Sequence, residues 1–502
     1  MAEKFLEIEN VDKRFSGVHA LNAVSLSINR GEIHCLAGEN GSGKSTLIKI
    51  VAGVVKPDAG SIGIGGRKFS ALHPIDAIHA GIQVIYQDFS LFPNLTVAEN
   101  LALNSQLDQR KRVVNWRGVR RVAEHALQNI NVDIDLDRTV ETLSVADKQL
   151  VAISRALLGN ARLVIMDEPT TALTQKEVDR LFVIIKSMQE RGIATLFVSH
   201  KLREVLAISE RITILRNGQK IAEGPVADFD EPKIVYHMTG RSVTDQRFTF
   251  SNAGKQPVLE VRGLSRGREF RDIDFSLYPG EILGVTGLLG SGRTELALSL
   301  FGVKPAESGS ITIAGKETPI RSISDGIAAG IAYVPEDRIS EGLFLSQSIS
   351  RNVIVSVLAR LAKPSGLLDF AQADRIVDDW IHALNIATPD VTRPVQSLSG
   401  GNQQRVVLAK WLSTNARILI LNGPTVGVDI GSKADIHEKL KELAAKGLAL
   451  IVISDDIPEL VQNCNRVLVM HKGRVVRELE GGEGGEGAIS ENGLLETLNG
   501  LD

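Results

Sequence analysis

The chain contains two copies of one sequence pattern, and this duplication limits the possible folds more than any other feature. GEIHCLAGENGSGKST, starting at Gly31, recurs as GEILGVTGLLGSGRTE, starting at Gly280, an offset of 249 residues. LSVADKQLVAISRALL, starting at Leu143, recurs as LSGGNQQRVVLAKWLS, starting at Leu398, an offset of 255 residues. Blocks that recur in one order at nearly constant offsets indicate duplicated domains. The total of 502 residues is also too long for one ordinary core.

The boundary between the two copies falls in RSVTDQRFTFSNAGKQP, which is polar and ends in proline. We therefore expect a first domain over residues 1–240, a linker over 241–257 and a second domain over 258–502. In the C-terminal stretch EGGEGGEGAISENG, the Gly- and Glu-rich composition predicts a solvated, flexible segment, centred on residues 480–488.

Within each copy, short apolar runs such as RLVIM and LALIVIS alternate with segments of helical period such as TQKEVDRLFVIIKSMQERG. Continuous apolar strands that alternate with helices are typical of a parallel sheet covered on both faces. Residues 90–158 and 345–413 have a mostly helical pattern, which predicts a helical subdomain inserted in each α/β core.

Charge and hydropathy exclude several classes of protein. The chain has 57 basic and 60 acidic residues, a balance that argues against a dedicated nucleic-acid binder. No apolar run reaches the roughly 18 residues of a membrane-spanning helix, and MAEKFLEIEN does not resemble a signal peptide. Two cysteines, Cys35 and Cys464, lie in different halves, so a disulfide is not expected. These features favour a soluble intracellular protein and leave a peripheral membrane role open.

The first copy contains a complete phosphate-binding loop. GENGSGKST follows an apolar strand and opens a helical run, as the GxxxxGKS pattern requires. Backbone N–H groups of such a loop point at phosphate, the lysine reaches the β- and γ-phosphates, and the serine hydroxyl ligates magnesium. The alternative is a Gly-rich turn that only precedes a helix. The candidate nucleotide-binding residues here are Gly38, Asn40, Gly41, Gly43, Lys44, Ser45 and Thr46.

Hydrolysis needs further groups, and four candidates follow strand-like runs of the first copy. Asp167 leaves the run RLVIM, where a magnesium partner is needed, and Glu168 beside it is placed to activate water. Gln87 in VIYQD is a candidate for contacting metal and water, and His200 in LFVSH for contacting the γ-phosphate. The alternatives are carboxylates that merely face solvent, and a structural Gln and His.

A P-loop, YQD, an LSGGNQQ that opens a helix, MDEPT and VSH, in that order, resemble the ATP-binding cassette (ABC) family over essentially the whole chain. The tandem arrangement, GLLGSGRTE, YVPEDR and LSGGNQQRVVLAKWL resemble the ATPase subunits of bacterial importers for ribose, galactose, xylose and arabinose. The resemblance implies two P-loop NTPase cassettes, each with a mainly parallel sheet, an antiparallel β part and an inserted helical subdomain. It also implies ATP and Mg²⁺ as ligands.

In this family two cassettes close head to tail, and each ATP lies between the P-loop of one cassette and the signature of the other. The resemblance therefore implies that one composite site is complete. Its first-copy residues are those above, and the second copy adds its signature LSGGNQ and the D-loop VGVD, residues 426–429. The residues implied in the second copy are Ser399, Gly400, Gly401 and Asp429.

The second composite site has changed in nearly every part. Arginine replaces the P-loop lysine, and Asn422 and Gly423 replace Asp167 and Glu168, a loss that departs from the family pattern. The facing signature is LSVADKQ, without the paired glycines. We expect this site to bind ATP or ADP weakly or structurally and not to hydrolyse it. Its residues are Gly287, Gly292, Arg293, Thr294, Glu336, Asn422, Gly423, Asp455 and, from the first copy, Ser144.

Phe15 lies 23 residues before Gly38, where the family has an aromatic side chain that stacks on adenine. The second copy has no equally placed aromatic residue. The alternative is that Phe15 packs in the core.

The resemblance implies an importer ATPase on the cytoplasmic face of the cell membrane, with membrane permease subunits, expected to be two, and a solute-binding protein as partners. Coupling to the permease would involve FSLFPNLTVAEN and ISEGLFLSQSISRN, whose apolar residues are equally consistent with core packing. A soluble tandem ATPase acting on ribosomes or nucleic acid is the alternative. It is disfavoured by the short linker and the small number of cysteines.

Overall fold

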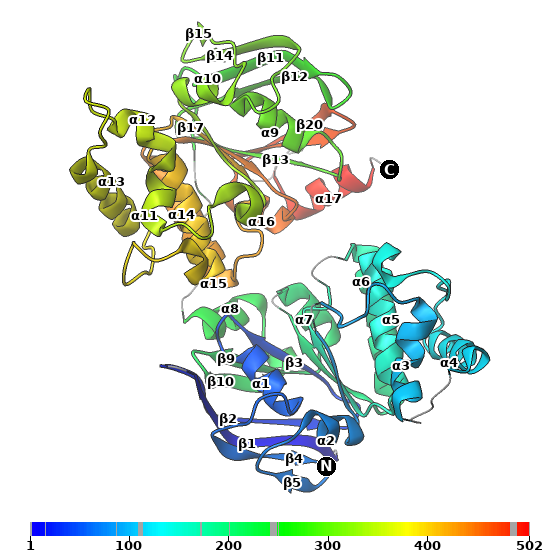
Figure 1. Cartoon of the computed structure of the whole chain (residues 1–502). Coiled ribbons are helices and arrows are strands. Elements are labelled where there is room, and N and C mark those ends of the chain that lie inside the picture. Colours follow the sequence, from blue (N-terminus) through cyan, green and yellow to red (C-terminus); the bar gives the residue numbers. More distant parts are fainter. Residues whose placement is uncertain are drawn as a thin grey trace. The chain divides into compact units, whose positions relative to one another are not determined.

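The computed structural model describes residues 3–15, 17–86, 88–108, 114–170, 173–199, 201–240, 248, 250–481 and 489–500. The chain divides into two compact units, Met1–Val243 and Thr244–Asp502 (Figure 1). The linker expected over 241–257 contains this division. Most of its first half lies outside the described residues, so its bounds and those of the two domains stay predictions.

The first unit contains a six-stranded sheet of order β10-β9-β3-β8-β7-β6, in which only the edge strand β10 runs antiparallel to its neighbour. A four-stranded antiparallel sheet has the order β2-β1-β4-β5. The bounds are β1 Lys4–Phe15, β2 Val18–Asn29, β3 Ile33–Gly38, β4 Ala59–Ile64, β5 Arg67–Phe69, β6 Ile82–Ile85, β7 Leu163–Asp167, β8 Ala194–Val198, β9 Arg211–Arg216 and β10 Gln219–Pro225.

Strand β7 shows how the sequence assigns its two faces. Val164 and Met166 belong to a core shared with the helical subdomain, whereas Leu163 and Ile165 belong to a core shared with the antiparallel sheet. Successive side chains of a strand point to opposite faces, so a continuous apolar run is buried on both sides. The helices are α1 Lys44–Val51, α2 Pro74–His79, α3 Val97–Asp108, α4 Trp116–Gln128, α5 Val145–Leu158, α6 Gln175–Glu190, α7 Leu202–Ile208 and α8 Glu231–Thr239.

The second unit repeats this architecture, with sheet orders β16-β17-β18-β13-β19-β20 and β12-β11-β14-β15. Its strands are β11 Leu259–Arg266, β12 Phe270–Leu277, β13 Ile282–Gly287, β14 Ser308–Ile313, β15 Lys316–Glu317, β16 Ile331–Val334, β17 Ile418–Asn422, β18 Ala449–Ile453, β19 Arg466–His471 and β20 Arg474–Glu480. Its helices are α9 Arg293–Phe301, α10 Ile323–Ala328, α11 Ile349–Ile354, α12 Leu358–Leu361, α13 Phe370–Ala383, α14 Gly400–Leu412, α15 Ile430–Ala445, α16 Ile457–Asn463 and α17 Glu491–Asn499.

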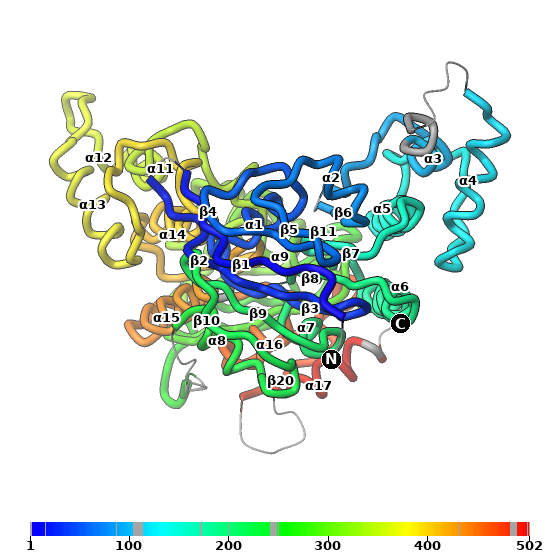
Figure 2. The backbone as a smooth tube through the Cα atoms, turned by 90° about the horizontal axis from the view of Figure 1, so that it is seen from below, coloured from blue at the N-terminus to red at the C-terminus, as the bar shows by residue number. Residues whose placement is uncertain are grey.

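The predicted α/β class is therefore confirmed, with a helical subdomain in each unit. In Figure 2, α4 of the first unit and α12 and α13 of the second extend away from the strands of their own unit. One expectation is wrong in part. Residues 482–488 lie outside the described residues, but the chain beyond them is not a solvated tail, because Ile489 is buried and α17 begins at Glu491. No helix in the described part of the chain has the length and apolar character needed to cross a bilayer.

Candidate nucleotide sites

The candidate residues of the first unit follow the carboxyl ends of adjacent parallel strands. β3 ends at Gly38, β7 at Asp167 and β8 at Val198, and Asp167 pairs directly with Val198. Because carboxyl ends of parallel strands meet at one edge of a sheet, the P-loop and the two carboxylates share that edge, the usual ligand site of an open α/β sheet. Gln87 and His200 lie outside the described residues, after β6 and β8 respectively.

The P-loop of the first unit closes around its own lysine. The buried Lys44 Nζ donates to the carbonyl oxygens of Gly38, at 2.6 Å, and Glu39, at 2.9 Å. Gly43 caps α1 with a φ of 107°, and a Cβ there would lie 2.5 Å from the Ala20 carbonyl oxygen, so only glycine fits. The loop therefore keeps its phosphate-binding geometry while the ammonium remains inside it. Asn40, Gly41 and Ser45 are exposed at the mouth of the loop, and Thr46 is half-buried.

The two carboxylates after β7 differ in environment. Burial raises the pKa of Asp167, the charge of Glu168 raises it further, and the charge of Lys44 acts in the opposite direction. Glu168 has a φ of 50°, in the left-handed region that non-glycine residues avoid. A residue held there costs about 1–3 kcal/mol, and such strain clusters at functional sites. The backbone N–H of Glu168 donates to Val198 at 2.9 Å, which helps to hold this turn.

Gly423 adopts the same turn in the second unit, with a φ of 57° and an N–H bond to Ile453 at 2.8 Å. Glycine occupies this region without strain. A Cβ at Gly423 would lie 2.8 Å from the Val426 Cγ2 atom and 3.1 Å from the Glu336 Cγ atom. The second unit therefore has the same left-handed turn after its strand, but it has neither the carboxylate nor the strain of a non-glycine residue at this position.

This comparison predicts a trade between stability and activity at Glu168. We expect Glu168→Gly to abolish ATP hydrolysis. The free energy of unfolding of the first unit should stay unchanged or rise by up to about 1 kcal/mol. Chemical denaturation of the full-length chain with a probe in the first unit measures the change. A loss of more than about 1 kcal/mol would show that the side chain of Glu168 is structural.

The second P-loop carries its own counter-ion. Arg293 Nη1 donates to the Gly287 carbonyl oxygen at 2.9 Å and also pairs with the carboxylate of Asp455. A phosphate entering this loop has to compete with Asp455 for the guanidinium. Gly292 caps α9 with a φ of 95°, so the backbone of the loop is kept, and Thr294 lies half-buried in the first turn of α9.

Asn422, at the position that corresponds to Asp167, has a neutral hydrogen-bond partner. Asn422 is buried, and its Nδ2 lies 3.5 Å from the hydroxyl of Tyr333. Burial raises the pKa of Tyr333 to about 12, so this partner is uncharged. Glu336 is exposed. Asn422 thus has an amide that is paired with a neutral hydroxyl, where the first unit has the carboxylate of Asp167.

The signature and D-loop residues have structural roles that the sequence interpretation missed. Ser399 caps α14 and Ser144 caps α5, each accepting a backbone N–H bond from three residues further on. Asp429 caps α15, accepting from Ser432 N at 2.9 Å and from Ser432 Oγ at 3.0 Å. Thr174 precedes α6, and its N–H and its hydroxyl donate to the Glu177 carboxylate at 2.7 Å and 2.8 Å. A polar residue before a helical run is the signal that identifies such caps.

Phe15 is the last residue of β1, and 45% of its surface is exposed. The ring lies 5.4 Å from Lys13 Nζ and is not among the buried core residues of its unit. This excludes the core-packing alternative and leaves the ring accessible to a flat ligand.

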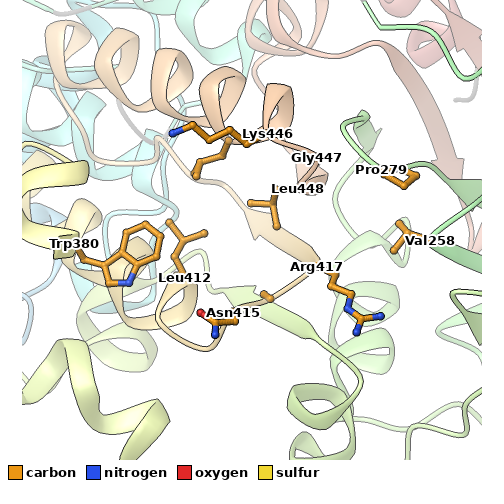
Figure 3. Close-up of a pocket in the computed structure, with 11 residues that line it drawn as sticks. Val258, Pro279, Trp380, Leu412, Asn415, Arg417, Lys446, Gly447 and Leu448 are labelled. Carbon is orange, nitrogen blue, oxygen red and sulfur yellow. The ribbon is translucent and has the colours of Figure 1, made fainter. Parts of the chain in front are cut away.

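A separate pocket lies at the opposite end of the large sheet of the second unit (Figure 3). Its lining includes Pro279, Arg417 and Leu448, which precede the amino ends of β13, β17 and β18. The candidate nucleotide residues follow the carboxyl ends, so none of them lines this pocket.

The fold and the two P-loops define a nucleotide-binding protein with two cassettes in one chain. The family model described as ABC transporter matches residues 21–171 and 270–426. A relative named ribose import ATP-binding protein RbsA 3, from Rubrobacter xylanophilus, is 42% identical, with 99% of both chains covered. A relative from Agrobacterium fabrum, named putative ribose/galactose/methyl galactoside import ATP-binding protein 1, is 40% identical, covering 95% of this chain and 94% of its own.

A solved structure of an ATP-binding cassette of an ABC transporter in its ADP conformation is 30% identical, with a TM-score of 0.43. It covers 48% of this chain and 100% of its own. The chain belongs to the ABC transporter family, as an ATPase subunit with two cassettes. The alternative of an ATPase acting on ribosomes or nucleic acid is not favoured.

Proposed function

We propose that this ATPase drives import of a pentose or hexose such as ribose or galactose, and that it hydrolyses ATP at one composite site. The proposal of a single hydrolytic site rests on how the sequence changes are distributed between the two units. The first unit keeps Lys44, Asp167 and Glu168 but has the signature LSVADKQ, whereas the second keeps LSGGNQQ and has lost both carboxylates. If each unit formed a site by itself, each site would be incomplete. If the sites are shared head to tail, one is complete.

In the proposed site Lys44 binds the β- and γ-phosphates and Glu168 activates the attacking water. Ser399 and the N-terminus of α14 bind the γ-phosphate from the other side, where the positive end of a helix favours an anion. Gln87 and His200 are proposed to contact the water and the γ-phosphate. The left-handed turn at Glu168 sets the direction of its carboxylate. The names of the relatives support ATP as the ligand.

Magnesium is proposed to bind between Ser45, Asp167, Gln87 and the phosphates of ATP. In the described residues no group of three or more His, Cys, Asp or Glu side chains is arranged to hold a metal. This suits Mg²⁺, which usually takes one or two protein ligands and completes its shell with water and substrate phosphates. When bound, the ion neutralises charge on the phosphates.

The second composite site is proposed to bind a nucleotide weakly and without turnover. Its P-loop arginine is already paired with Asp455, and Gly423 supplies no base. The facing residues Val145 and Ala146 replace the glycines that allow a close backbone approach to phosphate.

Two exposed phenylalanines are proposed to dock on membrane permease subunits. Phe92 is 48% exposed and Phe344 is 56% exposed, whereas Leu343 beside it is buried. Each ring sits on a loop held by a buried asparagine: Asn100 binds both the N–H and the carbonyl of Phe92, and Asn352 does the same for Phe344. A rigidly held, exposed aromatic side chain is typical of a binding surface.

The packing of three apolar residues near these two rings supports this proposal. Phe89, Leu91 and Leu345 pack against the cores of their own units. They therefore belong to the core, and Phe92 and Phe344 are left to make contacts outside the chain.

Replacing both rings tests the importer assignment. We expect Phe92→Ser with Phe344→Ser to reduce co-purification with co-expressed permease subunits and uptake of labelled ribose by about tenfold or more, because hot-spot aromatics contribute 2 kcal/mol or more each. The ATPase activity of the free chain should remain. The matched control is Val183→Ser on α6, which removes an apolar side chain 68% exposed. Unchanged uptake in the double variant would contradict the docking proposal.

A further inference from the structure

Arg338 joins three segments of the second unit through one guanidinium group. It begins a short π-helical turn, residues Arg338–Gly342, directly after Asp337. Its Nη1 donates to the Val426 carbonyl oxygen at 2.7 Å, and its Nη2 donates to the Gly427 carbonyl oxygen at 3.0 Å. Both acceptors belong to the D-loop. The planar fork of arginine can satisfy two neighbouring carbonyls at once, which a lysine cannot do in the same geometry.

The third segment is the start of the signature helix. A Cβ at Gly400 would lie 2.8 Å from Arg338 Nη2, so the guanidinium occupies the space that this glycine leaves. A Cβ at Gly401 would lie 2.3 Å from Ser432 Oγ, in the first turn of α15 that Asp429 caps. The two glycines therefore let the signature helix pack closely against both Arg338 and the helix that follows the D-loop.

The sequence of the first unit lacks the residues that make this link in the second unit. The repeat places Phe89 at the position of Arg338, and Val145 and Ala146 at the positions of the two glycines. The first unit therefore has neither the arginine nor the two glycines that form this contact in the second unit. The arginine occurs in the unit whose signature and D-loop are intact.

We propose that Arg338 is a positioning residue for ATP hydrolysis, which fixes the N-terminus of the signature helix relative to the D-loop. This inference rests on the composite site proposed above, where both segments of the second unit reach the ATP held by the first. Its Nε is buried without a hydrogen-bond partner among the described residues. The unpaired Nε indicates that the position of the side chain is set by the two carbonyls and by packing. The arginine also lies in the segment that ends at Phe344, so movement at the proposed permease contact has a short path to the D-loop.

The test compares ATPase kinetics of the full-length chain carrying Arg338→Gln or Arg338→Lys. We expect Arg338→Gln to lower kcat by about tenfold or more, since small misplacements of binding groups cost up to about 10²-fold. KM for ATP should stay within about twofold, because the P-loop is untouched. Arg338→Lys should give an intermediate kcat. The matched control is Arg360→Gln, which removes a similar half-buried bond, from Nη2 to the Ser413 carbonyl at 2.7 Å, away from the D-loop.

A second variant changes the contact between Arg338 and the signature helix at the helix itself. Gly400→Ala forces the guanidinium to move, so we expect it to lower kcat when Arg338 is present and to add little in the Arg338→Gln background. If thermal unfolding shows that Arg338→Gln does not fold, the kcat values of Gly400→Ala and Arg338→Lys test the proposal instead. The inference is overturned if kcat stays within about twofold, or if Arg360→Gln lowers it equally. Activity that survives Glu168→Gln would instead overturn the composite site itself.

Discussion

Glu168→Gln should reduce steady-state ATP hydrolysis by about 10²–10⁴-fold, the usual contribution of a general base. The substitution keeps the size of the side chain and removes its negative charge and its ability to accept a proton. Because Gly423 stands at the equivalent position of the second unit, no other carboxylate of this kind can take over. The expected loss therefore applies to the whole chain and not to half of its activity.

Phosphate release from the purified chain at saturating ATP measures this effect, and equilibrium binding of ATP should change little. Glu177→Gln is a suitable control, because it changes a half-buried carboxylate in the first turn of α6 of the same unit. Residual activity near one half of the wild-type value would mean that both sites hydrolyse ATP.

Ser399→Ala and Ser144→Ala should have very different effects on turnover, although the two serines have the same place in the fold. Each caps the signature helix of its unit, so each substitution should cost a similar stability of about 1 kcal/mol. Only Ser399 is proposed to face the ATP that is hydrolysed. Loss of a hydroxyl that stabilises developing charge is expected to lower kcat by about 10²-fold.

The measurement is kcat for both variants, with thermal unfolding to confirm the matched loss of stability. Equal reductions in kcat would show that the serines act only as helix caps. A larger reduction for Ser144→Ala would reverse the assignment of the two sites.

The fold could be predicted from the sequence because the strands carry their own signal. Runs such as Leu163–Met166 are short and apolar at every position and alternate with helical segments, a pattern typical of strands buried on both faces. The P-loops were equally clear, since glycines at fixed spacing serve both the turn at Gly43 and phosphate binding. The error at Ile489 arose because glycine and glutamate dominate the composition around it, while one buried side chain is enough to return the chain to the core.

The details of the sites depended on contacts that no pattern records. The sequence does not show that Glu168 has a left-handed backbone, which it shares with Gly423 at the corresponding position. The sequence analysis placed Asp455 in the second site but not its partner, and in the structure it pairs with Arg293, a residue 162 positions away. The role of Gly400 likewise depends on Arg338, which lies in a different segment. Long-range pairs of this kind follow from the packing of the sheet and its loops.

Chemical cross-linking tests the central claim, that the first P-loop and the second signature share one ATP, most directly. Asn40→Cys and Ser399→Cys place thiols at the two proposed faces of the site, and the native Cys35 and Cys464 are buried, with pKa values raised by burial. With a short bifunctional maleimide, we predict a cross-link that requires a non-hydrolysable ATP analogue and is absent for Asn40→Cys with Ser144→Cys. Cross-linking that ignores nucleotide, or that favours Ser144→Cys, would contradict the composite site.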